Sequence, residues 1–431
     1  MNTVAFHTLG CKVNQYDTQA MLEKFREAGY AIVPWNEDAD VYVVNTCTVT
    51  GTGDKKSMQI ARRLRREHPL SEVVLCGCLA QRKGAELLDT GARLILGTQH
   101  RGEVVTLLEK AVKDGTQMCA VDALTAETPF EELNITDQED HTRAIMKIQE
   151  GCNNHCTYCI IPSVRGPIRS RPLEDVVREA QKLADAGYKE LVLTGIHLTS
   201  YGRDLQDNVG LIDAIEAVQV ISGVERIRLG SLEPGVATEE FARRLGRCNK
   251  VCPQFHLALQ SGSDTVLARM ARRYNTAMYL RSAEHLRSVF PMAAFTTDVL
   301  TGFPGETETE YQETCAFVEK MAYARIHVFP YSQREGTKAA VMPGQLTREE
   351  KERRARGLIA LGERLAAAYQ EKWLGKESTV LLEEQLPEGW VGYTPEYIRV
   401  LVASCPACRQ GVQLPVRLTA VDGEGMKGEL I

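Results

Sequence analysis

The sequence lacks any apolar run long enough to cross a membrane. Its first ten residues, MNTVAFHTLG, also lack the basic segment and the long apolar core that are typical of a signal peptide. We therefore expect a cytoplasmic protein with no membrane partner. Because thiols stay reduced in the cytoplasm, the 13 cysteines are expected to be metal ligands or buried thiols.

An excess of positive charge is absent as well. The 431 residues carry a formal net charge of −6 in an ordinary globular composition, which is enough chain for two or three domains. Any contact with RNA would therefore come from a local patch. The clearest patch is 55–68, where six basic residues face a single acidic one, Glu67. A solvated helix face explains this patch equally well.

A fourth ligand is missing from the most concentrated group of cysteines. Residues 151–159 read GCNNHCTYC, which places Cys152, Cys156 and Cys159 as C-x3-C-x2-C, and the next cysteine is the distant Cys248. A zinc site would normally add a second C-x2-C or a pair of histidines. Three thiolates can instead hold three corners of an iron–sulfur cube, leaving one iron free to bind a small molecule. A zinc knuckle or a chance cluster is the alternative.

Short apolar strands alternate with helical segments in the first hundred residues. This alternation predicts a parallel sheet, and ligands of such sheets bind beyond the carboxyl ends of the strands. Cys11, Cys47 and Cys78 each follow a strand end, so we expect a second metal site there. Cys76 competes with Cys78, which is preferred because it lies beyond Gly77, in the loop. Burial as small apolar side chains is the alternative for each. The predicted strands are 3–10, 39–44, 72–75 and 93–96, and the helices 17–28, 58–67 and 84–88.

The peptides around these cysteines resemble the amino-terminal domain of the methylthiotransferases. They read TLGCKVNQ at 8–15, NTCTVT at 45–50 and GCLAQ at 77–81. Methylthiotransferases are radical enzymes that insert sulfur and a methyl group into an unactivated C–H bond. The resemblance implies an auxiliary 4Fe–4S cluster on Cys11, Cys47 and Cys78.

The C-x3-C-x2-C spacing is similar to that of radical S-adenosylmethionine (SAM) enzymes. The resemblance implies that Cys152, Cys156 and Cys159 hold a second 4Fe–4S cluster, whose open iron binds the amino and carboxylate groups of SAM. An electron passed to SAM then yields the 5′-deoxyadenosyl radical, and the protein aims this chemistry. We expect flavodoxin or ferredoxin as the electron donor. The resemblance covers essentially the whole chain.

About six further β–α units follow this cysteine loop and predict a partial barrel. Four residues lie late in the predicted strands or just beyond them: Gly195, Glu233, Gln260 and Asp298. The first three belong to the peptides LTGIH, SLEP and LQSGS, and Asp298 precedes GFPGE. All four peptides resemble family motifs. The four residues are candidates to contact SAM, and a structural role is the alternative for each. The predicted strands are 144–148, 190–193, 226–229, 255–259, 293–300 and 325–329, and the helices 173–186, 211–220, 238–245, 264–289 and 308–321.

The sequence divides into an amino-terminal α/β domain (1–113), an acidic linker (114–142), the radical SAM core (143–369) and a tail (370–431). The tail resembles in position the RNA-binding module called TRAM. Its short alternating strands predict a small antiparallel barrel. Cys405 and Cys408 form a lone C-x2-C, for which a hairpin turn with free thiols is favoured over zinc. The predicted strands of the tail are 379–383, 389–393, 397–403, 412–421 and 425–430.

Three arginines, Arg165, Arg169 and Arg171, follow the C-x3-C-x2-C loop and are candidates to hold an RNA backbone. Local ion pairing is the alternative. The residues after Cys11 resemble most closely the branch of the family that acts on threonylcarbamoyladenosine. We therefore expect a tRNA methylthiotransferase that modifies C2 of N6-threonylcarbamoyladenosine at position 37 of the anticodon loop.

Two alternatives keep the chain open to other functions. The same chemistry could act on isopentenyladenosine in tRNA or on an aspartate of a ribosomal protein. The second alternative is an iron–sulfur or zinc protein that binds RNA and has no catalytic activity. Reductive cleavage of SAM separates the second alternative from an enzyme.

Overall fold

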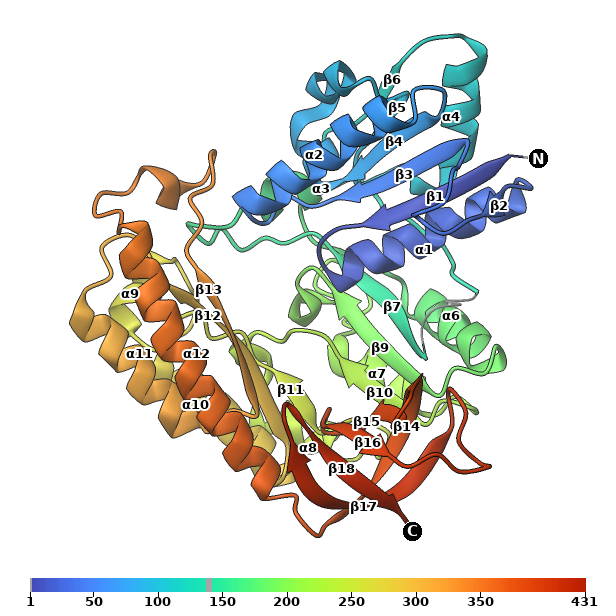
Figure 1. Ribbon diagram of the computed structural model, residues 1–431. Helices are drawn as coiled ribbons and strands as arrows, with labels where there is room; N and C mark the ends of the chain where they lie inside the picture. The colour runs from blue at the N-terminus through green and yellow to red at the C-terminus, as the bar shows by residue number, and fades with distance from the viewer. Residues whose placement is uncertain (1, 137–141) are drawn as a thin grey trace.

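The computed structural model describes residues 2–136 and 142–431. Three layered parts follow one another along the chain: an amino-terminal α/β domain, an open parallel sheet backed by helices, and a small closed barrel (Figure 1). The mixed α/β class expected from the sequence is confirmed.

The amino-terminal sheet has six parallel strands in the order β2-β1-β3-β4-β5-β6. α1 and α4 pack on one face through Phe25 and Leu108, and α2 packs on the other through Ala61 and Leu64. The strands are β1 (Thr3–Thr8), β2 (Ala31–Ile32), β3 (Val41–Thr46), β4 (Glu72–Gly77), β5 (Leu94–Leu96) and β6 (Met118–Ala120). The helices are α1 (Lys12–Glu27), α2 (Gly51–Glu67), α3 (Cys78–Lys83) and α4 (Val104–Lys113), with short 3₁₀ turns η1 (Gly84–Thr90) and η2 (Arg101–Glu103).

The segment predicted to be a linker is partly structural. β6 pairs with β5 in parallel and completes the amino-terminal sheet. Leu133 and Ile135 are buried against Tyr16 and Ala20 of α1. The linker prediction is therefore wrong for 118–120, because a three-residue strand is too short to show a period in the sequence. Part of the segment, 137–141, lies outside the described residues.

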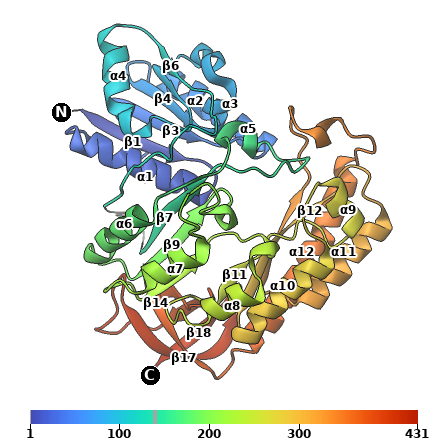
Figure 2. The ribbon, with the colours of Figure 1, turned by 180° about the vertical axis from the view of Figure 1, so that it is seen from behind.

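The core has six parallel strands, which run in the order of the sequence in two adjoining sheets, and the short β8 pairs antiparallel with β7 at one edge. β7, β9 and β10 pair in parallel, as do β11, β12 and β13, and isolated bridges such as Leu232↔Leu257 connect the two halves. This arrangement confirms the predicted partial barrel. The helices cover its outer side (Figure 2). The strands are β7 (Arg143–Glu150), β8 (Arg169–Ser170), β9 (Glu190–Gly195), β10 (Arg226–Leu229), β11 (Gln254–His256), β12 (Ala294–Thr301) and β13 (Arg325–Pro330). The α-helices are α5 (Ile161–Arg165), α6 (Leu173–Asp185), α7 (Leu211–Gln219), α8 (Glu239–Leu245), α9 (Asp264–Arg269), α10 (Thr276–Val289), α11 (Glu308–Met321) and α12 (Arg348–Glu371). The 3₁₀ turns are η3 (Leu198–Ser200), η4 (Pro234–Val236) and η5 (Lys338–Val341).

The helix predicted over 264–289 is in fact two helices. α9 ends at Arg269, and Ala271 adopts a left-handed φ of 55°. Asn275 then caps α10, its side chain accepting a hydrogen bond from the backbone N–H of Met278. This break places Arg272 in the loop between α9 and α10 and not on a helix, which matters for the site.

The tail forms a closed barrel in the order β14-β15-β16-β18-β17. Four of its pairs are antiparallel, as predicted, whereas β16 and β18 pair in parallel. The reason is geometric, because a closed ring with an odd number of strands cannot alternate direction at every pair. The likeness to TRAM stays a prediction. The strands are β14 (Glu377–Leu386), β15 (Gly389–Tyr393), β16 (Arg399–Val402), β17 (Gln413–Asp422) and β18 (Gly425–Leu430).

Candidate functional site

Three cysteines meet at the carboxyl edge of the amino-terminal sheet. Cys11 directly precedes α1, Cys47 follows β3, and Cys78 opens α3 directly after β4. Gly10 has a φ of +103°, and a Cβ there would lie 3.1 Å from the Sγ of Cys47. The glycine therefore lets the loop of Cys11 come close to Cys47. Cys47 and Cys78 are buried and Cys11 is exposed.

The side chain of Cys76 lies in the apolar core and not with these three thiols. It belongs to β4 and packs in the apolar core with Val43 and Val74. Its thiol donates to the carbonyl of Val44 at 3.5 Å. Burial raises the pKa of Cys76, and it also raises the pKa of Cys78, to about 11. These surroundings favour Cys78 over Cys76 as the third thiol of the group.

The second group of thiols lies in the loop between β7 and α5. Gly151 has a φ of +72°, and a Cβ there would lie 1.8 Å from the carbonyl oxygen of Pro167, so the loop requires glycine. The N–H of Cys159 donates to the carbonyl of Cys156 at 3.0 Å, which closes the turn. All three thiols of the loop are half-buried.

One buried arginine donates to a cysteine sulfur in each group. The Nε of Arg165 lies 3.2 Å from the Sγ of Cys78, and the Nη1 of Arg272 lies 3.2 Å from the Sγ of Cys156. A neighbouring guanidinium stabilises the thiolate form, which is the form that binds metal. Both groups therefore have the donor chemistry that an iron–sulfur cluster requires.

Among the described residues, no three His, Cys, Asp or Glu side chains lie close enough together to enclose a single metal ion. A zinc ion holds each of its thiolates at about 2.3 Å. A four-iron cluster binds each thiolate through a different iron atom, so its ligands are spread more widely.

Arg165 does not reach the surface, contrary to its predicted RNA contact. Its side chain is 0% exposed and pairs with Asp17 at 3.0 Å and Glu150 at 3.1 Å. Lys147 pairs with the same two carboxylates at 2.6 and 3.3 Å, and Arg101 also pairs with Asp17. Burial would raise the pKa of Asp17, but the three cations hold it below its usual value. This network joins α1 of the first domain to the core.

Arg169 and Arg171 are buried too. Arg171 pairs with Glu179 at 2.6 Å and with Glu132 at 2.7 Å, while Arg169 donates to the carbonyl of Arg165 at 3.0 Å. The structure therefore supports the alternative prediction, local ion pairing, for Arg171. Arg169 is buried and makes a backbone hydrogen bond, but it makes no ion pair among the described residues. The sequence offered ion pairing as an alternative but did not identify the partners, and Glu132 lies 39 residues from Arg171.

Glu233 lies beside the loop of the second thiol group. It accepts hydrogen bonds from Asn154 at 3.2 Å and pairs with His197 at 3.1 Å and with Arg272 at 3.0 Å. Burial would raise the pKa of Glu233, but the hydrogen bond from His197 and the charge of Arg272 lower it to about 2. The ionised carboxylate and Arg272 thus meet within reach of Cys156. The sequence missed Asn154 and His197, although both lie inside quoted motifs.

The other three residues that were predicted to contact SAM lie at or near the ends of different strands. Gly195 packs against Gln149, since a Cβ would lie 2.8 Å from that side chain. Gln260 has an unusual φ of +67°, and its N–H donates to the carbonyl of Asp298 at 2.9 Å. The Asp298 carboxylate lies 3.5 Å from the Nε2 of His256. Contacts of Gly195, Glu233, Gln260 and Asp298 with SAM stay predictions.

Comparisons with known proteins match two parts of the chain to two different family models. Residues 146–318 match the family model described as "Radical SAM superfamily", and residues 3–97 match "Uncharacterized protein family UPF0004". A protein of Bacillus subtilis named "Threonylcarbamoyladenosine tRNA methylthiotransferase MtaB" is 43% identical, over 93% of this chain and 90% of its own. The chain belongs to the radical SAM tRNA methylthiotransferase family. It is a radical SAM enzyme, and it uses SAM and a 4Fe–4S cluster.

Other relatives of this methylthiotransferase carry two different names. A protein of Thermotoga maritima with the same name as the Bacillus relative is 35% identical over 93% of this chain and 91% of its own. A protein of Symbiobacterium thermophilum named "tRNA-2-methylthio-N(6)-dimethylallyladenosine synthase" is 34% identical over 99% and 94%. The family is therefore shared by proteins whose names give different nucleosides.

Among solved structures, the radical SAM methyltransferase TsrM from Kitasatospora setae is similar in fold. It aligns with a TM-score of 0.57 and 15% identity, over 79% of this methylthiotransferase and 77% of TsrM. Within residues 2–136 and 142–431, no helix is both long and apolar enough to cross a membrane.

Proposed function

We propose that this enzyme adds a methylthio group to C2 of N6-threonylcarbamoyladenosine at position 37 of tRNA, using two 4Fe–4S clusters. The observation that carries the proposal is the 43% identity, over nearly the whole chain, with a relative named for that nucleoside. Relatives of Thermotoga maritima, Aquifex aeolicus and Chlamydia pneumoniae bear the same name at 34–37% identity.

The two groups of thiols are the proposed holders of the clusters. Cys152, Cys156 and Cys159 would hold the cluster that supplies the electron for reductive cleavage of SAM. Cys11 and its two partners at the sheet edge would hold the auxiliary cluster. Arg272 faces the thiol of Cys156 and also Glu233, so it would orient the carboxylate that is proposed to contact SAM.

Lys12 favours the threonylcarbamoyl nucleoside over the dimethylallyl one. It is the first residue of α1, directly after Cys11, and its side chain is accessible. A lysine side chain is cationic at neutral pH. The threonyl group ends in a carboxylate, which a cation attracts, whereas the dimethylallyl group is apolar.

Mass spectrometry of tRNA nucleosides tests the proposal. Cells with the gene deleted should lose 2-methylthio-N6-threonylcarbamoyladenosine and accumulate its precursor, and the gene on a plasmid should restore the product. Loss of the methylthio-dimethylallyl nucleoside instead would establish the alternative substrate that the Symbiobacterium relative suggests. An unchanged profile, in cells that make the modification by no second enzyme, would refute a tRNA substrate. Flavodoxin and ferredoxin are the proposed electron donors.

A further inference from the structure

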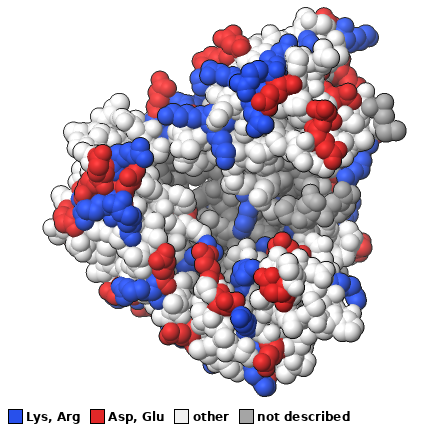
Figure 3. Space-filling view, viewed as in Figure 1, with Lys and Arg blue, Asp and Glu red and all other residues white. Residues whose placement is uncertain are grey.

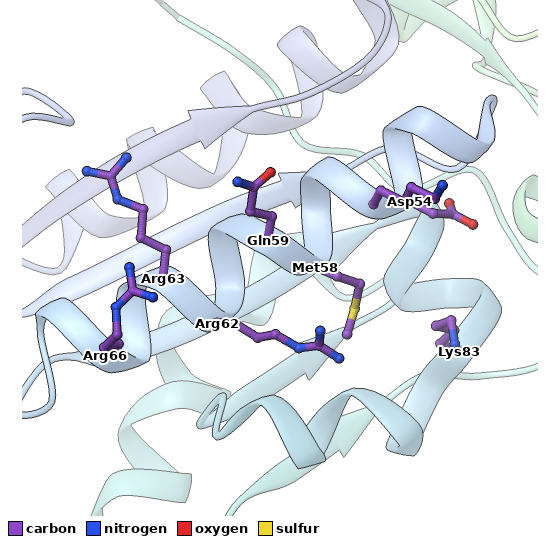
Figure 4. Close-up of a pocket in the computed structure, with 8 residues that line it drawn as sticks. Asp54, Met58, Gln59, Arg62, Arg63, Arg66 and Lys83 are labelled. Carbon is purple, nitrogen blue, oxygen red and sulfur yellow. The ribbon is translucent and has the colours of Figure 1, made fainter.

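A surface groove runs between α2 and α3 of the amino-terminal domain. It has a volume of about 610 Å³. In Figure 4, the side chains of Met58 and Arg62 reach from α2 toward the helix that carries Lys83. The residues that line the groove are Asp54, Lys55, Met58, Gln59, Arg62, Arg63, Arg66 and Lys83.

The groove has a cationic stripe on one face of α2. Lys55, Arg62 and Arg66 are exposed, and their spacings of seven and four residues place them along one side of the helix. At 1.5 Å per residue, the stripe is about 16 Å long. Figure 3 shows Lys and Arg side chains gathered over this part of the domain.

Few acidic side chains pair with the cations of the stripe, so most of the positive charge is available to a ligand. In the part of the chain that the structure describes, Lys55 and Arg62 make no ion pair, and Arg66 pairs only with Glu67, at 3.0 Å. The side chain of Arg66 is 75% exposed, so solvent screens that pair. The one acidic residue in the lining, Asp54, is paired with Arg82 and Arg334.

The lining contains no aromatic side chain. Proteins that read unpaired bases stack them on aromatic rings, whereas contacts to the backbone come from lysine and arginine. The groove therefore suits the phosphates of a nucleic acid and not its bases.

The stripe begins in the helix that follows Cys47, one of the thiols of the first group. Thr50, three residues after Cys47, caps α2, and the N–H of Gly51 donates to Ser332 in the loop after β13. The first turn of α2 thus lies where the amino-terminal domain meets the core. An RNA strand with one base in the site between the domains would pass its neighbouring phosphates along the stripe.

We propose that the groove between α2 and α3 binds the phosphate backbone of the anticodon stem of tRNA, through Lys55, Arg62 and Arg66. The inference rests on the proposed function, since it takes tRNA as the substrate. It adds a binding surface that does not depend on the base at position 37 or on the sequence of the stem.

The test is the affinity of the cluster-loaded enzyme for tRNA as a function of salt. A variant with Lys55→Gln, Arg62→Gln and Arg66→Gln should bind tRNA about 10- to 100-fold more weakly near 0.1 M salt. The slope of log K against log salt should fall in magnitude by about 2 to 3, because three phosphate contacts are lost. Exchanging base pairs in the stem should change neither value.

A matched control removes three charges from the opposite face of the same sheet, with Arg26→Gln on α1 and Lys110→Gln and Lys113→Gln on α4. This control should keep the wild-type affinity and slope. Both variants should keep the wild-type cluster absorbance and melting temperature, since all six side chains lie on helix surfaces.

Equal affinity and slope for the groove variant and wild type would overturn the inference. So would an equal loss in the control, because the effect would then come from net charge alone. The proposed function fails separately, when wild-type enzyme that binds tRNA forms no methylthio nucleoside.

Discussion

Replacing Arg165 with glutamine should destabilise the junction of the first domain and the core. Arg165 is one of three cations, with Arg101 and Lys147, that neutralise Asp17 and Glu150. All five side chains are at most 2% exposed, so water cannot replace the lost charge. Removing one member of a buried ion-pair network costs about 3–5 kcal/mol.

This loss corresponds to a drop in melting temperature of roughly 6–20 °C for a unit of about 200 residues. Differential scanning calorimetry of the cluster-loaded enzyme under anaerobic conditions measures it. Arg165→Lys should lie between wild type and Arg165→Gln, because lysine keeps the charge but not the planar fork of donors. Arg348→Gln is the control, since it removes an ion pair of 2.6 Å whose arginine is 86% exposed. This change should leave the melting temperature almost unchanged.

Arg165→Gln also removes the hydrogen-bond donor that lies 3.2 Å from the Sγ of Cys78. The electron paramagnetic resonance signal of the proposed auxiliary cluster should therefore shift, and that of the cluster near Arg272 should not. A melting temperature for Arg165→Gln as high as that of the control would refute the account of the buried network. An unshifted auxiliary signal would refute the role of the hydrogen bond.

Three further predictions concern single positions. Cys152→Ala should abolish formation of 5′-deoxyadenosine from SAM, whereas Cys11→Ala should keep it and stop formation of the methylthio product; 5′-deoxyadenosine from Cys152→Ala would refute the cluster assignment. Gly151→Ala should reduce the iron content per chain, because its Cβ would lie 1.8 Å from a backbone oxygen, while Gly187→Ala, with φ also positive but no atom within 4 Å, should not. Hydrogen bonds from Arg269 lower the pKa of Glu310 to about 2, so the melting temperature of wild type at pH 7 should be higher than that of Glu310→Gln. This difference should shrink as the pH falls from about 4.5 toward 2, and a difference that persists at pH 2 would contradict it.

The strands of the core and of the tail could be predicted closely from the sequence. The predicted strand 226–229 is β10 in the structure, and the predicted strand 425–430 is β18 (Gly425–Leu430). Such strands are bounded by turn residues and are long enough to show their pattern. β6 and the break before α10 were missed because each depends on pairing or caps that involve only a few residues.

Spacing along the chain also predicted which loops carry thiols, since parallel strands bring their carboxyl ends to one edge. The partners of those thiols could not be predicted in this way. Arg165 and Cys78 are 87 residues apart, and Arg272 and Cys156 are 116 residues apart.

The sequence by itself determined the class of the protein, the two groups of cysteines and the order of the parts. These features depend on local patterns of apolar residues, glycines and thiols, which act over a few residues. The tertiary structure alone decided which arginines are buried beside the thiols and which remain on the surface of α2. Burial of a charge depends on carboxylates that folding brings from distant segments, and no local pattern records where those segments meet.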